Sequence, residues 1–322
     1  MGRVLFQELR SRGHEVYGCD LQHSAKPEVM RADIANHRQL ERVFRFAKPD
    51  VVYHLAAEFG RNNGEEFFSQ LWSTNCIGTQ NVIEECLRSG AGLIFASSSE
   101  AYGDDAHSLY SQGGTFTEGW LDHYTPTFHN NYALSKWANE KQIHIAAKNR
   151  GLRAVNLRFF NAFGPGEFYT PYRSVVCLFI YRLMHGLPIT VYKNYWRVFM
   201  YVDDWARTTA NVCERFDGLI ERAIANPLTK DGFCGSRPAC VPTYNIGGKE
   251  YTTVEAMKDK ILALLGTSES EISYLDAEKA NVTCKRPDIS LARRDLDHDP
   301  KITLDEGLPK TVSWLASIYG HK

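Results

Sequence analysis

The sequence lacks a long apolar run, an excess of charge of either sign, and paired cysteine motifs. Its longest purely apolar stretch covers residues 175–181, whereas a membrane-spanning helix needs about 20 residues. Lysine and arginine number 37 and aspartate and glutamate number 38, so the formal net charge is −1. A near-neutral chain has no general attraction for nucleic acid or anionic membranes. We therefore expect neither a nucleic-acid partner nor a membrane partner, and we exclude a polybasic binding protein.

The eight cysteines are scattered, and none of them forms a C-x-x-C pair. The residues after Met1 do not form the apolar segment of a signal peptide. Both features predict free thiols in a reducing, cytoplasmic compartment. No group of potential ligands implies a metal site.

The composition is that of an ordinary globular protein. Of 322 residues, 43% are hydrophobic and 23% are charged, which is enough to bury a core without disulfides or metals. Helical and strand patterns alternate through the first half and predict βαβ units, hence an α/β fold with a doubly wound parallel sheet. The expected helices cover residues 3–12, 37–46, 67–89 and 131–149, and the expected strands cover 15–20, 51–57, 93–97 and 154–159.

The pattern changes after about residue 165, where loops lengthen and aromatic residues and prolines cluster. Helical patterns return near residues 202–215, 253–265 and 303–317. We expect a sheet domain over residues 1–165 and a smaller, irregular lobe over 166–322, some of whose segments return to the sheet. In open α/β sheets, ligands bind at the carboxyl ends of the strands, and the lobe is expected to cover that edge.

Tyr132 and Lys136 are the first candidate catalytic residues. Four positions apart on a helix, they share one face, and the lysine charge is expected to lower the pKa of the tyrosine so that it can act as a base. A surface pair would have the same spacing. The polar run from Ser97 to Gly103 follows a predicted strand and can place a hydroxyl beside the phenol.

With these two motifs, the chain resembles the extended short-chain dehydrogenase/reductase family, specifically its NAD-dependent nucleotide-sugar epimerases and dehydratases. The resemblance covers nearly the whole chain through ordered motifs. These are His54–Ala57 (H-L-A-A), Thr74–Thr79 (T-N-x-x-G-T), Ser97–Gly103 (S-[ST]-x-x-x-Y-G), Tyr132 with Lys136 (Y-x-x-x-K), Arg158–Gly166 (R-x-F-N-x-x-G-P-G), Arg197–Asp204 (R-x-F-x-Y-V-x-D), Tyr244–Gly248 (Y-N-I-G-G) and Arg286–Asp288 (R-P-x-D). The resemblance implies a Rossmann-like fold with NAD as cofactor and a nucleotide-diphosphate sugar as substrate.

The same resemblance implies roles for individual residues. Tyr132 would take the proton of a sugar hydroxyl, Lys136 would orient the cofactor ribose, and Ser98 would bind the same hydroxyl; Ser99 and Glu100 would act in the second step. The residues implied in cofactor binding are Gly2, Asp20, Asp33, Ile34, Leu55, Ala56, Ala57, Asn75, Ser97, Tyr132, Lys136 and Phe159. Those implied in substrate binding are Ser98, Glu100, Asn161, Arg197, Arg286, Tyr169 and Arg173. Arginine suits the substrate diphosphate because its planar fork binds phosphate oxygens bidentately.

The chain departs from the family at its amino terminus. The family begins with a strand and G-x-x-G-x-x-G, whose glycines let a pyrophosphate approach a helix. Here Met1 and Gly2 stand where the last glycine and its helix are expected. We expect that the given sequence lacks a native segment; the alternative is a chain that binds NAD poorly or not at all.

Three reactions share a 4-ketosugar intermediate. Glu100 slightly favours a 4,6-dehydratase, in which it takes the C5 proton before the 6-hydroxyl leaves. A nucleotide-sugar epimerase needs neither Ser99 nor Glu100, and a glucuronate decarboxylase is the third alternative. A non-catalytic NAD sensor of the same fold is a different class, although it would have no need of Tyr132 as a base. The family also suggests a homodimer formed through the helices expected at 67–89 and 131–149.

Overall fold

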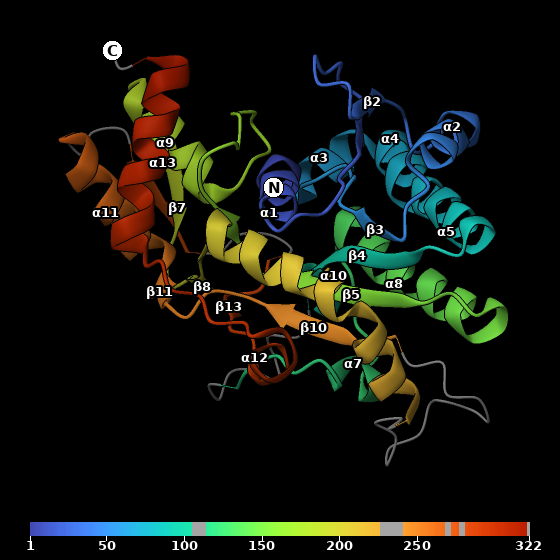
Figure 1. Ribbon diagram of the computed structural model, residues 1–322. Helices are drawn as coiled ribbons and strands as arrows, with labels where there is room; N and C mark the ends of the chain where they lie inside the picture. The colour runs from blue at the N-terminus through green and yellow to red at the C-terminus, as the bar shows by residue number, and fades with distance from the viewer. Residues whose placement is uncertain (105–113, 226–240, 268–271, 277–280, 321–322) are drawn as a thin grey trace.

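Parallel strands form the centre of the molecule. The computed structural model describes residues 1–104, 114–225, 241–267, 272–276 and 281–320. Four strands pair side by side in the order β10–β5–β4–β3, and all their pairings are parallel (Figure 1). They are β3 (Val51–His54), β4 (Gly92–Ser98), β5 (Ala154–Phe159) and β10 (Thr243–Ile246). Helices connect the strands, as the alternating sequence pattern predicted.

Both faces of this sheet are covered because alternate residues of a strand point to opposite sides. Ile94 and Ala96 of β4 belong to a core cluster that includes side chains of α10 (Val202–Ala225). Their neighbours Leu93 and Phe95 belong to a second cluster with α5 (Gly78–Ser89) and α8 (Asn131–Arg150). The prediction of a doubly wound parallel sheet is confirmed.

A separate parallel pair of strands lies beside the sheet. It consists of β1 (Gly18–Asp20) and β2 (Val29–Arg31), and in the described part of the chain β3 forms the edge of the four-stranded sheet. Helix α2 (His37–Ala47) connects β2 to β3, and α1 (Gly2–Ser11) packs against α10. The amphipathic helix α1 buries Leu5 and Leu9 in the main core.

The segment expected as one helix over residues 67–89 is interrupted. It consists of α4 (Phe68–Trp72), the π-helical turn η1 (Ser73–Ile77) and α5. A π turn holds an extra residue and is often found at functional sites. Here the turn carries Asn75, whose side chain bonds to the loop after β3. Hydrophobic periodicity does not reveal such a turn because the helix resumes with its apolar face on the core.

The second half of the chain contributes to both the sheet and a lobe. β10 pairs with β5, whereas α9 (Val175–Met184), α11 (Val254–Leu265) and α13 (Leu304–Tyr319) pack together at one end of the molecule (Figure 1). The remaining elements are α3 (Arg61–Glu66), η2 (Ser99–Tyr102), α7 (Trp120–His123), β6 (Ala162–Phe163), β7 (Ile189–Tyr192), β8 (Trp196–Val198), β9 (Met200–Tyr201), β11 (Tyr251–Thr253), β12 (Ile272–Leu275), β13 (Cys284–Lys285) and α12 (Ser290–Leu296).

One hydrophobic cluster contains residues from both halves, among them Leu5, Val155, Ile180 and Leu308. The lobe is therefore continuous with the core that supports the sheet. Among the described residues, no helix combines the length and the apolar character that crossing a membrane requires.

Candidate active site

Helix α8 positions Tyr132 and Lys136 at the carboxyl end of β4. Asn130 caps the helix by accepting a hydrogen bond from the Ala133 N–H at 2.8 Å, a preferred arrangement at helix starts. Tyr132 and Lys136 are 6% and 4% exposed. The Lys136 Nζ donates to the Ala96 carbonyl at 2.8 Å and lies 5.9 Å from the centre of the Tyr132 ring. The predicted pair is therefore buried inside the fold.

Strand β4 brings its terminal serines to the same place. The Ser98 Oγ accepts a hydrogen bond from the Glu100 N–H at 3.2 Å and so caps η2. The Ser98 side chain also lies close enough to Tyr132 to lower the pKa of its phenol, and η2 packs against α8. Ser98, Glu100 and Tyr132 thus come together as the motifs predicted.

The predicted lowering of the tyrosine pKa is wrong for this structure. Burial raises the pKa of Tyr132 above its usual value, the Ser98 side chain opposes the rise, and the charge of Glu100 adds to it. The Lys136 ammonium is bonded to the strand carbonyl rather than to the phenol. Burial lowers the pKa of Lys136 to about 8, against the attraction of Glu140 and Cys76. Tyr132 is therefore protonated in this state.

Lys285 is a member of the site that the sequence motifs did not reveal. Its Nζ donates to the Glu100 Oε1 at 2.5 Å, and the side chains of Lys285 and Glu100 are 4% and 18% exposed. Burial alone would raise the pKa of Glu100, but Lys285, assisted by Arg61 and Arg197, lowers it to about 2. Lys285 precedes the Arg286-Pro287 motif, yet only the pairing of β13 with β8 brings it within reach of Glu100.

A buried ion pair anchors α8 to the sheet below these residues. Arg158 of β5 donates to both carboxylate oxygens of Glu140, from Nε at 3.0 Å and from Nη2 at 2.7 Å. The Ser97 hydroxyl donates to the same carboxylate at 2.5 Å. Ser97, which the family resemblance assigns to the cofactor, thus contributes its side chain to the anchor.

The adenosine side of the predicted cofactor site lies at β1 and β2. Asp20 is exposed at the end of β1, and its Oδ1 accepts only the nearby Gln22 N–H at 3.0 Å among the described hydrogen bonds. Asp33 follows β2 and accepts from the Ala35 N–H at 2.9 Å. Ile34 is buried against Gly78, where a Cβ would lie 2.6 Å from Ile34 Cδ1.

The pyrophosphate side of the predicted site lies where α1 begins. Gly2 opens this helix next to Leu55, whose Cδ1 would lie 3.7 Å from a Cβ at Gly2. Ala56 and Ala57 continue the same loop with small side chains. A helix amino terminus offers free N–H groups to phosphate, and an acid at the end of a strand suits a ribose diol. The residues present therefore fit NAD.

Asn75 and Phe159 support this region from the interior. The Asn75 Oδ1 accepts from the Glu58 N–H at 2.8 Å, and its Nδ2 donates to the Glu58 carbonyl at 3.1 Å and to Ser135 Oγ at 3.0 Å. Asn75 thus fixes the loop after β3 beside α8. Phe159 ends β5 and packs edge-on against Trp205, with 5.3 Å between the ring centres.

Arg197 and Asn161, two of the predicted substrate ligands, are bonded to the chain itself. Arg197 is buried, and its described acceptors include the carbonyls of Trp196, Thr283 and Val282 and the side chain of Asn281. Asn161, at a positive φ of 33°, donates to the Val198 carbonyl at 3.1 Å.

Three further predicted ligands, Arg286, Tyr169 and Arg173, are partly or fully accessible. Arg286 is exposed, and its guanidinium lies 5.4 Å from the Tyr251 ring centre. Tyr169 stacks on Tyr181 with 3.6 Å between the ring centres. The exposed Arg173 donates to the Phe168 carbonyl at 3.1 Å. Of the two arginines predicted for the diphosphate, Arg286 has the more accessible guanidinium.

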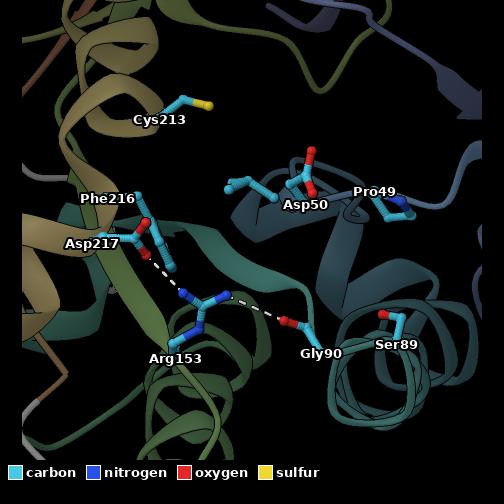
Figure 2. Close-up of a pocket in the computed structure, with 9 residues that line it drawn as sticks. Pro49, Asp50, Ser89, Gly90, Arg153, Cys213, Phe216 and Asp217 are labelled. Carbon is cyan, nitrogen blue, oxygen red and sulfur yellow. Dashed lines mark hydrogen bonds and ion pairs between the residues drawn. The ribbon is translucent and has the colours of Figure 1, made fainter.

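A cavity of about 420 Å³ lies at the amino ends of the strands, opposite the candidate active site. Its lining includes Asp50, which precedes β3, and Arg153, which precedes β5 (Figure 2). Arg153 pairs with Asp217 at 2.6 Å and donates to the Gly90 carbonyl at 3.2 Å. Because Ser98 and Tyr132 lie at the carboxyl ends of the strands, this cavity is separate from the candidate active site.

Known proteins resemble the chain over most of its length. The family model described as "NAD dependent epimerase/dehydratase family" matches residues 1–225. The UDP-N-acetyl-alpha-D-glucosaminuronate decarboxylase of Bacillus cytotoxicus is 26% identical to this chain, and the match covers 99% of this chain and 95% of that protein. The dTDP-glucose 4,6-dehydratase of Neisseria meningitidis is 28% identical to this chain, and the match covers 88% of this chain and 77% of that protein.

Solved structures agree on the fold. UDP-glucuronic acid 4-epimerase from Bacillus cereus, in complex with UDP-glucuronic acid and NAD, matches with a TM-score of 0.78. The two sequences are 22% identical, and the match covers 98% of this chain and 96% of that one.

Proposed function

The chain belongs to the NAD-dependent epimerase/dehydratase family, and from that premise we propose that it oxidises C4 of a sugar carried by a nucleoside diphosphate. The observation that carries the proposal is the cluster at the carboxyl end of β4, in which the buried Tyr132 and Lys136 meet the half-buried Ser98 and Glu100. NAD, the cofactor of this family, would accept the hydride from C4.

Tyr132 would take the proton from the sugar O4 while Ser98 holds the same oxygen. Its raised pKa makes it a weak base in this state, and a nearby positive charge would lower that pKa. Lys136 lies one helical turn away. It supplies such a charge at pH values below its own pKa of about 8. Contacts to the cofactor are proposed for Gly2, Asp20, Asp33 and Asn75, and Arg286 is proposed to bind the substrate diphosphate.

The second step takes place at C5 and C6, where Glu100 is proposed to act. In a 4,6-dehydration, Glu100 would take the C5 proton and the 6-hydroxyl would leave as water. A carboxylate with a pKa of about 2 is a poor base, and Ser99 is a poor acid, so this reaction requires the pair of Glu100 and Lys285 to separate. The resemblance to a dTDP-glucose 4,6-dehydratase supports dehydration.

Decarboxylation of a nucleotide-linked uronic acid is the second candidate. The observation that favours it is the cation of Lys285 beside Glu100, because loss of carbon dioxide from a 4-keto uronic acid requires no base at C5. Relatives named for UDP-glucuronic acid decarboxylase and UDP-glucuronate 4-epimerase support a uronic acid. Epimerisation, the third candidate, needs only the first step in both directions.

A direct assay separates these reactions. The purified chain is incubated with NAD and each of UDP-glucose, UDP-glucuronate, dTDP-glucose and GDP-mannose, and the products are identified by mass spectrometry. Loss of water identifies a dehydratase, loss of carbon dioxide identifies a decarboxylase, and a new isomer of unchanged mass identifies an epimerase.

The same protein is heat-denatured and its supernatant is examined for released NAD. NAD with no turnover of any sugar would favour a sensor, and an intact Tyr132 with Ser98 argues against that outcome. The cytoplasm is the proposed compartment, because the cysteines in the described residues are free thiols.

A further inference from the structure

We propose that the substrate sugar is a uronic acid whose C6 carboxylate is bound by Lys285. The inference rests on the proposed oxidation at C4 and names the substrate class for that site. A uronic acid carries no 6-hydroxyl, so this substrate class favours decarboxylation or epimerisation over 4,6-dehydration. It depends on the position of one buried ammonium group, on the hydrogen-bond donors that this group retains, and on the charges around it.

Lys285 is held in place by the short strand β13. That strand pairs in parallel with β8, and Lys285 lies opposite Arg197 in the register. The pairing directs the lysine side chain into the fold, where 4% of it is exposed and its Nζ meets Glu100 at the end of β4. Ser98 accepts the Glu100 N–H and influences the pKa of Tyr132, so the ammonium lies close to the proposed reaction centre.

The Lys285 ammonium keeps donors for a ligand. An ammonium has three N–H donors, and the described contacts of Lys285 include a single acceptor, Glu100. A buried charge with one partner is expensive to desolvate, and further hydrogen bonds offset that cost. A carboxylate offers two charged oxygens to the two remaining donors, whereas a 6-hydroxyl offers one neutral oxygen.

The surrounding charges also favour an anion. Arg61 and Arg197 act on both Glu100 and Lys285 through their positive charges. Among the described residues, Asp104 is an acidic group that interacts with the same pair, and its own pKa is raised chiefly by burial. A second carboxylate at Lys285 would therefore enter the field of three basic side chains.

Glu100 directs the ligand rather than competing for the whole ammonium. It occupies one donor and fixes the direction of the other two, as a buried charge partner does. A neutral C6 hydroxymethyl group leaves one of those donors without an acceptor, and an unmet buried donor weakens binding. The site is thus expected to discriminate by charge at C6, at a position away from the nucleotide.

The test measures binding separately from turnover. In the Tyr132→Phe background with NAD saturating, calorimetry compares two matched pairs: UDP-glucuronate with UDP-glucose, and GDP-mannuronate with GDP-mannose. We expect one uronate to bind about 10- to 100-fold more tightly than its hexose, as charge-assisted hydrogen bonds would give. Adding Lys285→Met should remove that preference, and adding Lys285→Arg should retain it.

Two further variants keep the result interpretable. Glu100→Gln with Lys285→Met removes both charges, so it avoids an unpaired buried carboxylate and should bind both sugars of a pair alike. Lys193→Met, at an exposed lysine paired with Asp276, should leave the preference unchanged. Equal binding of uronate and hexose, or a preference that survives Lys285→Met, overturns the inference and leaves the proposed function intact. Failure of all four sugars to bind overturns both.

Discussion

At the scale of single residues, burial opposes the chemistry expected of Tyr132. A phenol in a low-dielectric site holds its proton more tightly, and the charge of Glu100 acts in the same direction. Ser98 opposes this rise of the Tyr132 pKa, whereas the Lys136 ammonium is bonded to the Ala96 carbonyl. Tyr132 is thus poised to work only when positive charge is supplied at the site.

Replacing Tyr132 with phenylalanine tests this role. Tyr132→Phe removes the proton acceptor and keeps the ring that packs edge-on against Phe59. We expect turnover to fall by about 10²- to 10⁴-fold, the usual contribution of a positioned acid or base, with NAD affinity unchanged. Steady-state kinetics and cofactor titration measure the two effects. Turnover at the wild-type rate would remove Tyr132 from the mechanism.

The pair of Glu100 and Lys285 predicts a pH-dependent stability. The pKa of Glu100 is lowered from 4.5 to about 2, so its contribution is complete above pH 4.5 and is lost as the pH falls toward 2. Glu100→Gln leaves Lys285 buried without its carboxylate partner and should cost about 3–5 kcal/mol at pH 7. The difference from the wild type should shrink below pH 4.5.

Urea unfolding at several pH values measures this difference. Asp276→Asn, which breaks an exposed pair with Lys193, is the matched control and should cost at most about 1 kcal/mol. A Glu100→Gln penalty that stays constant from pH 7 to pH 3 would contradict the assigned ion pair.

At the scale of elements, the π turn η1 sets the loop that follows β3. Asn75 makes three hydrogen bonds from this turn, two to the backbone of Glu58 and one to Ser135. Asn75→Ala should therefore destabilise the fold by about 2–3 kcal/mol, at roughly 1 kcal/mol for each bond. It should also weaken NAD binding, because the loop carries Leu55, Ala56 and Ala57.

Thermal unfolding and NAD titration separate the two consequences. Gln80→Ala is a matched control, since it removes an exposed amide bonded to Glu84 on the same helical segment. Unchanged NAD affinity in Asn75→Ala would limit Asn75 to a structural role.

Local sequence predicted those parts of the site that depend on one element or on its immediate neighbour. Ser98 ends β4 and Tyr132 begins α8, so strand and helix patterns sufficed to bring them together. Lys285 escaped prediction because its contact with Glu100 joins residues 185 positions apart through the pairing of β13 and β8. The internal hydrogen bonds of the Arg197 guanidinium could not be predicted for the same reason, since their acceptors include the backbone beside β13.

At the scale of the whole molecule, one core joins the sheet and the lobe. Leu5, Val155 and Leu308 belong to the same cluster, so an unfolding experiment should show one transition for both parts. The boundary near residue 165 that loop composition predicted stays a prediction about ligand binding. We expect residues 1–165 to bind the cofactor and residues 166–322 mainly to bind the substrate.

The surface of the helical layer also predicts an oligomeric state. Ile77 of η1 and Ile145 of α8 are 58% and 57% exposed, and η1 packs against α8. Phe68 of α4 is 52% exposed on the neighbouring segment. Exposed apolar side chains on adjacent helices mark interaction surfaces. We propose that two copies of the chain associate through these helices, as the family resemblance suggested.

Light scattering coupled to size exclusion tests this association. We expect the wild type to elute at twice the chain mass of 36.6 kDa, and Ile77→Asp with Ile145→Asp to elute at the mass of one chain. Ile318→Asp is the control, since Ile318 is 44% exposed on α13, away from α8. A charged group buried in an apolar interface costs several kcal/mol, enough to shift a micromolar equilibrium to monomer. A monomeric wild type at these concentrations would show that the exposed isoleucines do not form a stable dimer interface.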